Sequence, residues 1–76
     1  MVHENLKRIR LAKGVTQLHL AKKIGISNMA YSRMENGETK IDVERLRSIS
    51  FLLGVDINIF FDEKLTEYVI LDLEVS

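Results

Sequence analysis

Segment 28–35 carries side chains that can hydrogen-bond to flat, polar partners. Asn28, Met29, Ser32 and Arg33 follow the spacing i, i+1, i+4, i+5, so a helix would place all four on one side. A guanidinium can donate two bonds to O6 and N7 of guanine, an amide can pair with adenine, and a methionine side chain can contact a thymine methyl group. This face therefore matches the base edges of the DNA major groove. The alternative is that each is an ordinary exposed side chain.

Apolar residues at helical spacing, interrupted by glycines, predict the helices that hold this face. Thr16, Ser27 and Asp42 belong to the residue types that cap helix N-termini. A tight turn at Gly25 separates two of the helices, which makes residues 16–35 a candidate helix-turn-helix. We expect helices at 4–13, 17–24, 28–35, 43–53 and 57–61, forming an all-α domain over residues 1–62.

The tail, 63–76, has a different pattern. Val69, Leu71 and Leu73 alternate with acids such as Asp72, and the local Tyr, Val and Ile content favours a β-strand. One strand cannot satisfy its own backbone groups, and no second strand is evident. We therefore expect the strand to pair with a second copy in an antiparallel ribbon that joins a homodimer. A frayed extension or a last helix is the alternative.

Charge is distributed unevenly along a chain whose formal net charge is zero. Residues 1–50 hold ten Lys and Arg against five acids, which gives +5, and residues 51–76 hold one Lys against six acids, which gives −5. A basic part and an acidic part suit a protein that meets a polyanion with one end. Chance asymmetry in a short chain is the alternative.

The run TQLHLAKKIGISNMAYSRMENG, residues 16–37, resembles the lambda-repressor and Cro-like helix-turn-helix family, also called the Xre family. The resemblance extends over residues 4–62 and implies a five-helix lambda-repressor-like DNA-binding domain. The matching residues in this run are Thr16, Gln17, Leu20, Ala21, Ile24, Gly25, Ile26, Ser27, Ser32, Glu35, Asn36 and Gly37.

The resemblance implies a role for several side chains. Arg10 and Glu35 correspond to a partly buried ion pair that ties the first helix to the end of the recognition helix. Gln17 corresponds to a residue that holds a phosphate and braces a base-contacting side chain. The expected base contacts are Asn28, Met29, Ser32 and Arg33, and the expected backbone contacts are Thr16, Gln17, Ser27, Asn36, Thr39 and Lys40.

Apolar residues also occur where the family usually has polar ones, at Leu11, Leu18, Phe51 and Ile59. Exposed apolar residues near the acidic tail indicate an interface. We expect the dimer interface to comprise Phe51, Leu52, Ile59, Val69, Leu71 and Leu73. Leu11 and Leu18 could pack on each other or on the amino terminus.

These features favour a sequence-specific transcriptional regulator, a repressor or autoregulator that binds double-stranded DNA at a palindromic operator as a homodimer. The alternative is an antitoxin or adaptor-type module whose main partner is a protein and whose DNA binding is secondary. The hydrophobic tail favours that alternative.

Other classes of protein find little support in the sequence. His3 and His19 have no acid or nucleophile arranged around them, and no metal-ligand spacing occurs, so we expect no enzyme, no metal and no cofactor. Cysteine is absent, which excludes disulfides. No apolar run approaches the roughly 18 residues of a membrane span, and the charged start argues against a signal peptide. We expect a cytoplasmic protein without membrane partners.

Overall fold

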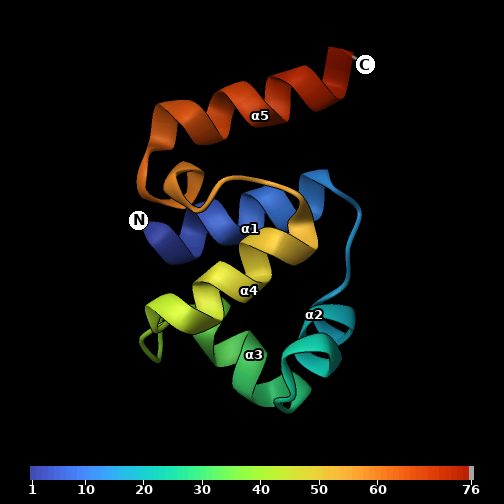
Figure 1. Cartoon of the computed structure of the whole chain (residues 1–76), viewed down its shortest axis with the longest axis vertical. Coiled ribbons are helices and arrows are strands. Elements are labelled where there is room, and N and C mark those ends of the chain that lie inside the picture. The colour runs from blue at the N-terminus through green and yellow to red at the C-terminus, as the bar shows by residue number, and fades with distance from the viewer. Residues whose placement is uncertain (76) are drawn as a thin grey trace.

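The computed structural model describes residues 1–75, and of Val75 only the backbone. Position 76, the end of the tail segment 63–76, lies outside the described residues. Every regular element within residues 1–75 is helical, and none is a strand. The elements in chain order are α1 (Val2–Ala12), α2 (Gln17–Ile24), α3 (Asn28–Glu35), α4 (Val43–Leu53), the 3-10 helix η1 (Ile57–Phe61) and α5 (Glu63–Val75) (Figure 1).

Three N-terminal caps define the helices that matter most for the site. The side-chain oxygens of Thr16, Ser27 and Asp42 each accept a hydrogen bond from the backbone N–H three residues later, at 3.1, 3.0 and 2.8 Å. These bonds satisfy donors that the first helical turn leaves without partners. Gly25 ends α2 with φ of 76°, a left-handed conformation that favours glycine. The predicted helices at 17–24, 28–35 and 43–53 are confirmed.

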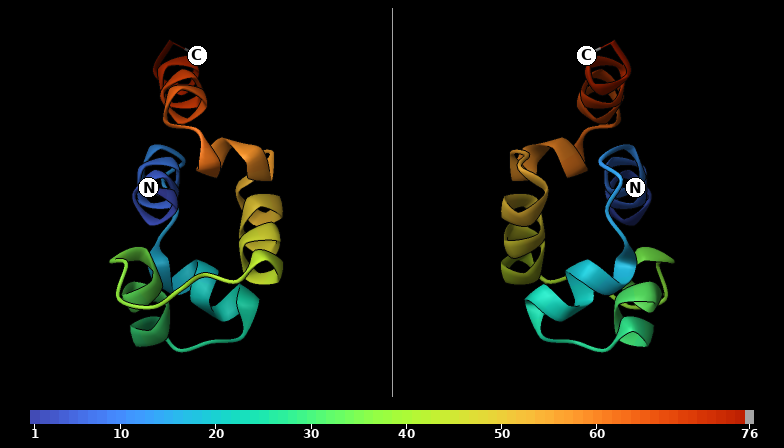
Figure 2. Two further views of the ribbon diagram at one scale, coloured as in Figure 1. Left: turned by 90° about the vertical axis from the view of Figure 1, so that its left-hand side faces the viewer. Right: turned by 90° about the vertical axis from the view of Figure 1, so that its right-hand side faces the viewer.

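A single apolar core joins the first four helices and η1. Tyr31 of α3 and Phe60 of η1 are its largest members. α2 and α3 form one end of the long axis and α5 forms the other, with α1 and α4 between them (Figures 1 and 2). The buried apolar residues are Leu6, Ile9, Leu20, Ala21, Tyr31, Met34, Leu46, Ile49, Leu53 and Phe60.

The predicted tail strand is wrong, because α5 is a helix from Glu63 to Val75. Asp62 starts it: Oδ1 of Asp62 accepts hydrogen bonds from the backbone N–H groups of Lys64 at 2.8 Å and Leu65 at 3.1 Å. A helix satisfies its backbone groups within itself. The segment therefore does not need a strand from a second chain, and the predicted antiparallel ribbon between two copies is wrong as well.

The face of α5 that packs on the core explains why this segment is a helix. Thr66 is fully buried, and Val69 and Ile70 are half-buried against the core. Their spacing, i, i+3, i+4, is helical. The Thr66 hydroxyl donates a 2.7 Å hydrogen bond to the carbonyl of Ile59. This buried stripe outweighs the alternation of apolar residues that favours a strand.

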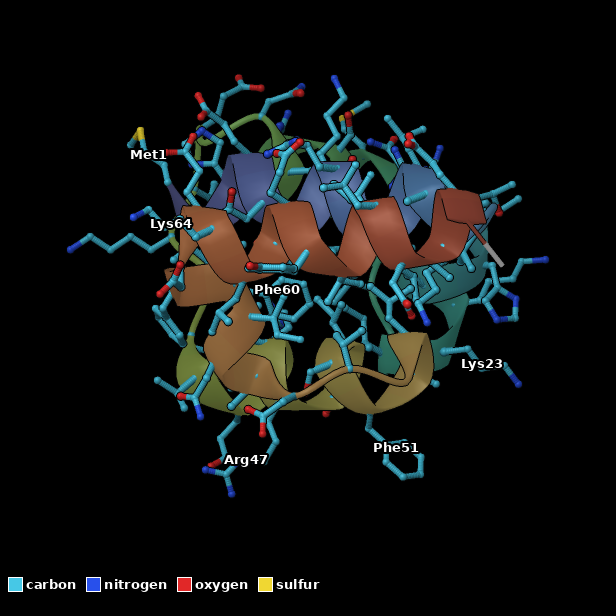
Figure 3. The ribbon with its side chains drawn as sticks, turned by 90° about the horizontal axis from the view of Figure 1, so that it is seen from above. Met1, Lys23, Arg47, Phe51, Phe60 and Lys64 are labelled. Atoms are coloured by element: carbon cyan, nitrogen blue, oxygen red, sulfur yellow. The ribbon has the colours of Figure 1, made fainter. Side chains whose placement is uncertain are left out.

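Polar groups join α1 to both α5 and η1. Arg8 of α1 pairs with Glu67 of α5, and Nδ2 of Asn5 in α1 donates a 2.9 Å hydrogen bond to the carbonyl of Phe60 in η1. Seen from above, α5 lies over α1, and Phe60 lies beside α5 on the side away from α1 (Figure 3). The tail is therefore tied to the same chain's first helix.

Asp62→Ala is expected to lower the free energy of unfolding by about 1 kcal/mol, because it removes the N-terminal cap of α5. Asp72→Ala is the matched control, since it removes the same charge from an exposed position within the helix. Urea denaturation of both variants measures the difference. Equal effects would contradict a capping role for Asp62.

Candidate nucleic-acid interface

The outer face of α3 presents the side chains predicted to contact bases. Asn28, Met29 and Arg33 are exposed, and Ser32 is half-buried. Nη2 of Arg33 lies 3.4 Å from Sδ of Met29, one helical turn earlier. The structure thus brings Met29 and Arg33 into direct contact on this face.

The residues predicted to contact the DNA backbone lie around α3. Thr16 and Ser27 use their hydroxyl oxygens as acceptors in the helix caps, and a hydroxyl that accepts still has a proton to donate. Each helix N-terminus also favours negative charge nearby. Thr16, Ser27, Asn36, Thr39 and Lys40 are exposed, and Gln17 is half-buried.

A buried ion pair fixes the orientation of α3 relative to α1. Nε of Arg10 lies 3.0 and 2.9 Å from Oε1 and Oε2 of Glu35, and Nη2 lies 2.8 Å from Oε1. Nη1 of Arg10 donates a further 2.8 Å bond to the carbonyl of Val15. The side chain of Glu35 is fully buried and that of Arg10 is 8% exposed. The predicted pairing of these two residues is present, and it joins helix α1 to the last turn of α3.

Burial and hydrogen bonding have opposite effects on the pKa of Glu35. Burial raises the pKa, but hydrogen bonds from Arg10 and from Gln17 lower it, and the net pKa lies below the ordinary value of a glutamate. Glu35 is therefore ionised at neutral pH. The ion pair is charged, desolvated and well bonded, which is the condition under which such a pair is stable.

Gln17 links the start of α2 to the same network. Nε2 of Gln17 donates a 3.2 Å hydrogen bond to Oε1 of Glu35. Glu35 thus connects α1, the first turn of α2 and the end of α3. The expected role of Gln17, to hold a phosphate and brace a base-contacting side chain, stays a prediction. In this structure its amide contacts the carboxylate of Glu35 at the end of α3.

Sequence reasoning missed two contacts at this site. The bond from Gln17 to Glu35 spans 18 positions and has no local pattern. The contact of Met29 with Arg33 does have one, because residues four apart on a helix are neighbours. That spacing was a usable signal for the pair.

The side chains predicted for a dimer interface divide into two groups. Phe51 is 84% exposed and projects away from the fold (Figure 3), and Leu52 and Leu71 are also exposed. Ile59 and Val69 are half-buried against the chain's own core. Leu73 is half-buried as well.

Leu11 and Leu18 are both exposed, at 59% and 48%, and nothing in the structure explains either residue.

The region of residues 6–60 matches the family model described as helix-turn-helix. Three proteins of Bacillus subtilis (strain 168) are similar in sequence. The chain is 36% identical over 72 residues to the uncharacterized HTH-type transcriptional regulator YqaE, covering 95% of this chain and 62% of that protein. It is 39% identical over 67 residues to the uncharacterized HTH-type transcriptional regulator YqaF, covering 88% of each.

The third relative is an SPbeta prophage-derived uncharacterized HTH-type transcriptional regulator, YonR, at 36% identity over 55 residues. That alignment covers 72% of this chain and 51% of YonR. The chain belongs to the lambda-repressor and Cro-like (Xre) helix-turn-helix family. In this Xre-family chain α2 and α3 have the arrangement of a helix-turn-helix pair, in which the second helix is generally the one that enters the major groove.

The described part of this Xre-family chain contains neither a metal-binding cluster nor a membrane-spanning helix. Within residues 1–75, no group of three or more His, Cys, Asp or Glu side chains is placed to hold a metal ion. Among the same described residues, no helix has the length and apolar character needed to cross a bilayer.

Proposed function

We propose that this chain is a sequence-specific DNA-binding transcriptional regulator that represses its target, or its own gene, from a palindromic operator bound as a homodimer. The observation that carries the proposal is the exposed α3 face of Asn28, Met29 and Arg33, held in a fixed orientation by the bonds of Glu35 to Arg10 and Gln17. Side chains held in place by packing and hydrogen bonds can read base edges with discrimination.

Charge supports the same orientation on DNA. α5 lies at the opposite end of the molecule from α2 and α3 (Figure 1) and carries four acids against one lysine, a net charge of −3. Lys22, Lys23, Arg33 and Lys40 lie in or next to the helix-turn-helix. Electrostatic attraction therefore favours an orientation in which the helix-turn-helix end of the protein faces the DNA phosphates and α5 points away from them.

Exposed apolar side chains support the homodimer. Phe51, Leu52 and Leu71 are the exposed members of the predicted interface, and large apolar residues in contact with water commonly mark protein contacts. Two copies related by a two-fold axis would present two recognition helices. Their half-sites would lie about 34 Å apart, one turn of DNA.

Selection of binding sites from random duplex DNA tests the proposal. We expect recovery of an inverted repeat, and an affinity for it that falls steeply with salt because phosphate contacts release counterions. Selection that returns no inverted repeat would contradict a dimeric operator. Affinity that is independent of salt would contradict the predicted backbone contacts.

A protein-interaction module is the second candidate, and the 84% exposure of Phe51 is the observation that favours it. Gel filtration and a mobility shift assay in the same buffer separate the two functions. A stable dimer that shows no salt-dependent DNA affinity would support the interaction module and exclude the regulator.

A further inference from the structure

The three methionines of the chain occupy different surroundings. Met29 is 65% exposed on the recognition helix, and its sulfur lies 3.4 Å from Nη2 of Arg33. Met34 is buried in the core at 2% exposure. Met1 is exposed at the start of α1, outside the base-reading face. Met29 alone among them combines an accessible thioether with a contact to a residue expected to read a base.

We propose that Met29 is a peroxide-sensitive site at which oxidation of the thioether switches off base reading by Arg33. The inference rests on the proposed function, because it presumes that Arg33 contacts DNA. Peroxide would then regulate DNA binding without moving α3, whose orientation is fixed by the bonds of Arg10 and Gln17 to Glu35.

The chemistry requires one oxidant and no other reactant. Hydrogen peroxide transfers one oxygen atom to the sulfur lone pair of Met29, its O–O bond breaks, and water leaves. The sulfur loses two electrons and the peroxide gains them. The product is methionine sulfoxide, which is polar where the thioether was apolar, and which methionine sulfoxide reductases return to the thioether.

The position of the new oxygen explains the loss of function. A thioether is a weak hydrogen-bond acceptor, so the contact between Met29 and Arg33 leaves the guanidinium able to move onto a base. A sulfoxide oxygen is a far stronger acceptor and would hold the guanidinium N–H groups that guanine needs. The polar group would also remove the apolar contact that Met29 could make with a thymine methyl.

Burial separates Met29 from Met34. Oxidation follows exposure, and the sulfur of Met34 sits in the core, where it lies 3.9 Å from Nη1 of Arg45. Mild peroxide treatment of the folded chain is therefore expected to modify Met29 and Met1 before Met34. Met1 then provides an exposed methionine that is not in contact with Arg33.

The test compares the protein before and after peroxide treatment, with peptide mass spectrometry assigning each added oxygen atom. Modification at Met29 is expected to lower the affinity for the selected DNA site about tenfold, the scale of one bidentate base contact. Binding to random DNA is expected to change little, since phosphate contacts are unaffected. Treatment with a methionine sulfoxide reductase and a thiol should restore the specific affinity.

Met29→Leu is the control, because leucine keeps an apolar side chain but has no sulfur to oxidise. Its DNA affinity after treatment is compared with its own affinity before treatment, and the two are expected to be equal. This variant retains Met1 and Met34, so a peroxide-dependent loss in it would assign the effect to those residues and overturn the proposal.

DNA itself supplies a second readout. The selected duplex is expected to protect Met29 from peroxide and to leave Met1 reactive. Unchanged affinity of protein oxidised at Met29 would overturn this inference while leaving the proposed function intact. Untreated protein that prefers no DNA sequence would overturn the proposed function, and the inference with it.

Discussion

Arg10→Ala is expected to destabilise the fold by about 3–5 kcal/mol, because it leaves the carboxylate of Glu35 buried without its cation. Glu35 is fully buried and accepts three hydrogen bonds from Arg10 and one from Gln17, so the variant removes most of the bonds to its carboxylate. Small domains have roughly 5–15 kcal/mol of stability in total. The variant should therefore be largely unfolded at temperatures where the parent chain is folded, as measured by urea and thermal denaturation.

The pH dependence of stability is expected to reverse in this variant. In the parent chain the pKa of Glu35 lies below its ordinary value, so its contribution to stability is present above the unfolded pKa and is lost as pH falls through the folded pKa. Without Arg10, burial raises the pKa of Glu35. Protonation would then relieve the buried charge, and the stability difference between parent and variant should narrow as the pH is lowered.

A double variant distinguishes two causes of the destabilisation by Arg10→Ala, namely a buried carboxylate without its cation and the loss of side-chain packing. Replacing Arg10 and Glu35 together with leucine removes both charges, and apolar replacement of a buried ion pair is often close to neutral. We expect the double variant to recover most of the stability that Arg10→Ala loses. A double variant as unstable as the single one, with no narrowing at low pH, would show that packing of the Arg10 side chain is the dominant contribution.

The helices near the site were predictable because their signals are local. Thr16, Ser27 and Asp42 each precede a run of apolar residues at helical spacing, and Gly25 marks a left-handed turn. These signals depend on neighbours within four residues. α2, α3 and α4 accordingly begin and end where the sequence indicates.

The tail was mispredicted because two periodicities coexist in it. Val69, Leu71 and Leu73 alternate as in a strand, while Thr66, Val69 and Ile70 follow helical spacing. Thr66 counts as polar in a hydropathy pattern, yet it is buried and bonded to the carbonyl of Ile59. The tertiary contact that favours a helix over a strand is therefore made by Thr66, which a pattern based on hydropathy does not count as a core residue.

The connections within the candidate site are long-range, which limits what the sequence can specify. Arg10 and Glu35 could be paired only through the family resemblance, since 25 positions separate them. Gln17 has no residue nearby in sequence that points to Glu35 as its partner. The identity of the exposed α3 side chains was predictable, whereas the network that orients them required the packed structure.

Arg33→Ala is expected to lower the affinity for the selected operator by about tenfold to a hundredfold and to relax the preference at one base pair. The reason is that a bidentate contact with guanine contributes about 1–3 kcal/mol of discrimination. The side chain of Arg33 is exposed and its guanidinium contacts the sulfur of Met29, a residue on the surface of the same helix, so its loss should leave the fold intact. Binding to operators altered at each position in turn measures the effect.

Two further variants identify the kind of contact that Arg33 makes. Arg33→Lys keeps the charge but loses the planar fork, so it should retain affinity for random DNA and still lose the base preference. Lys40→Ala removes an exposed cation from the loop after α3 and should weaken all sequences alike, with the salt slope reduced by about 1. Arg33→Ala could instead lower the affinity for every DNA sequence by the same factor, as Lys40→Ala should. Arg33 would then be a phosphate contact, and Asn28 and Ser32 would be the residues that read bases.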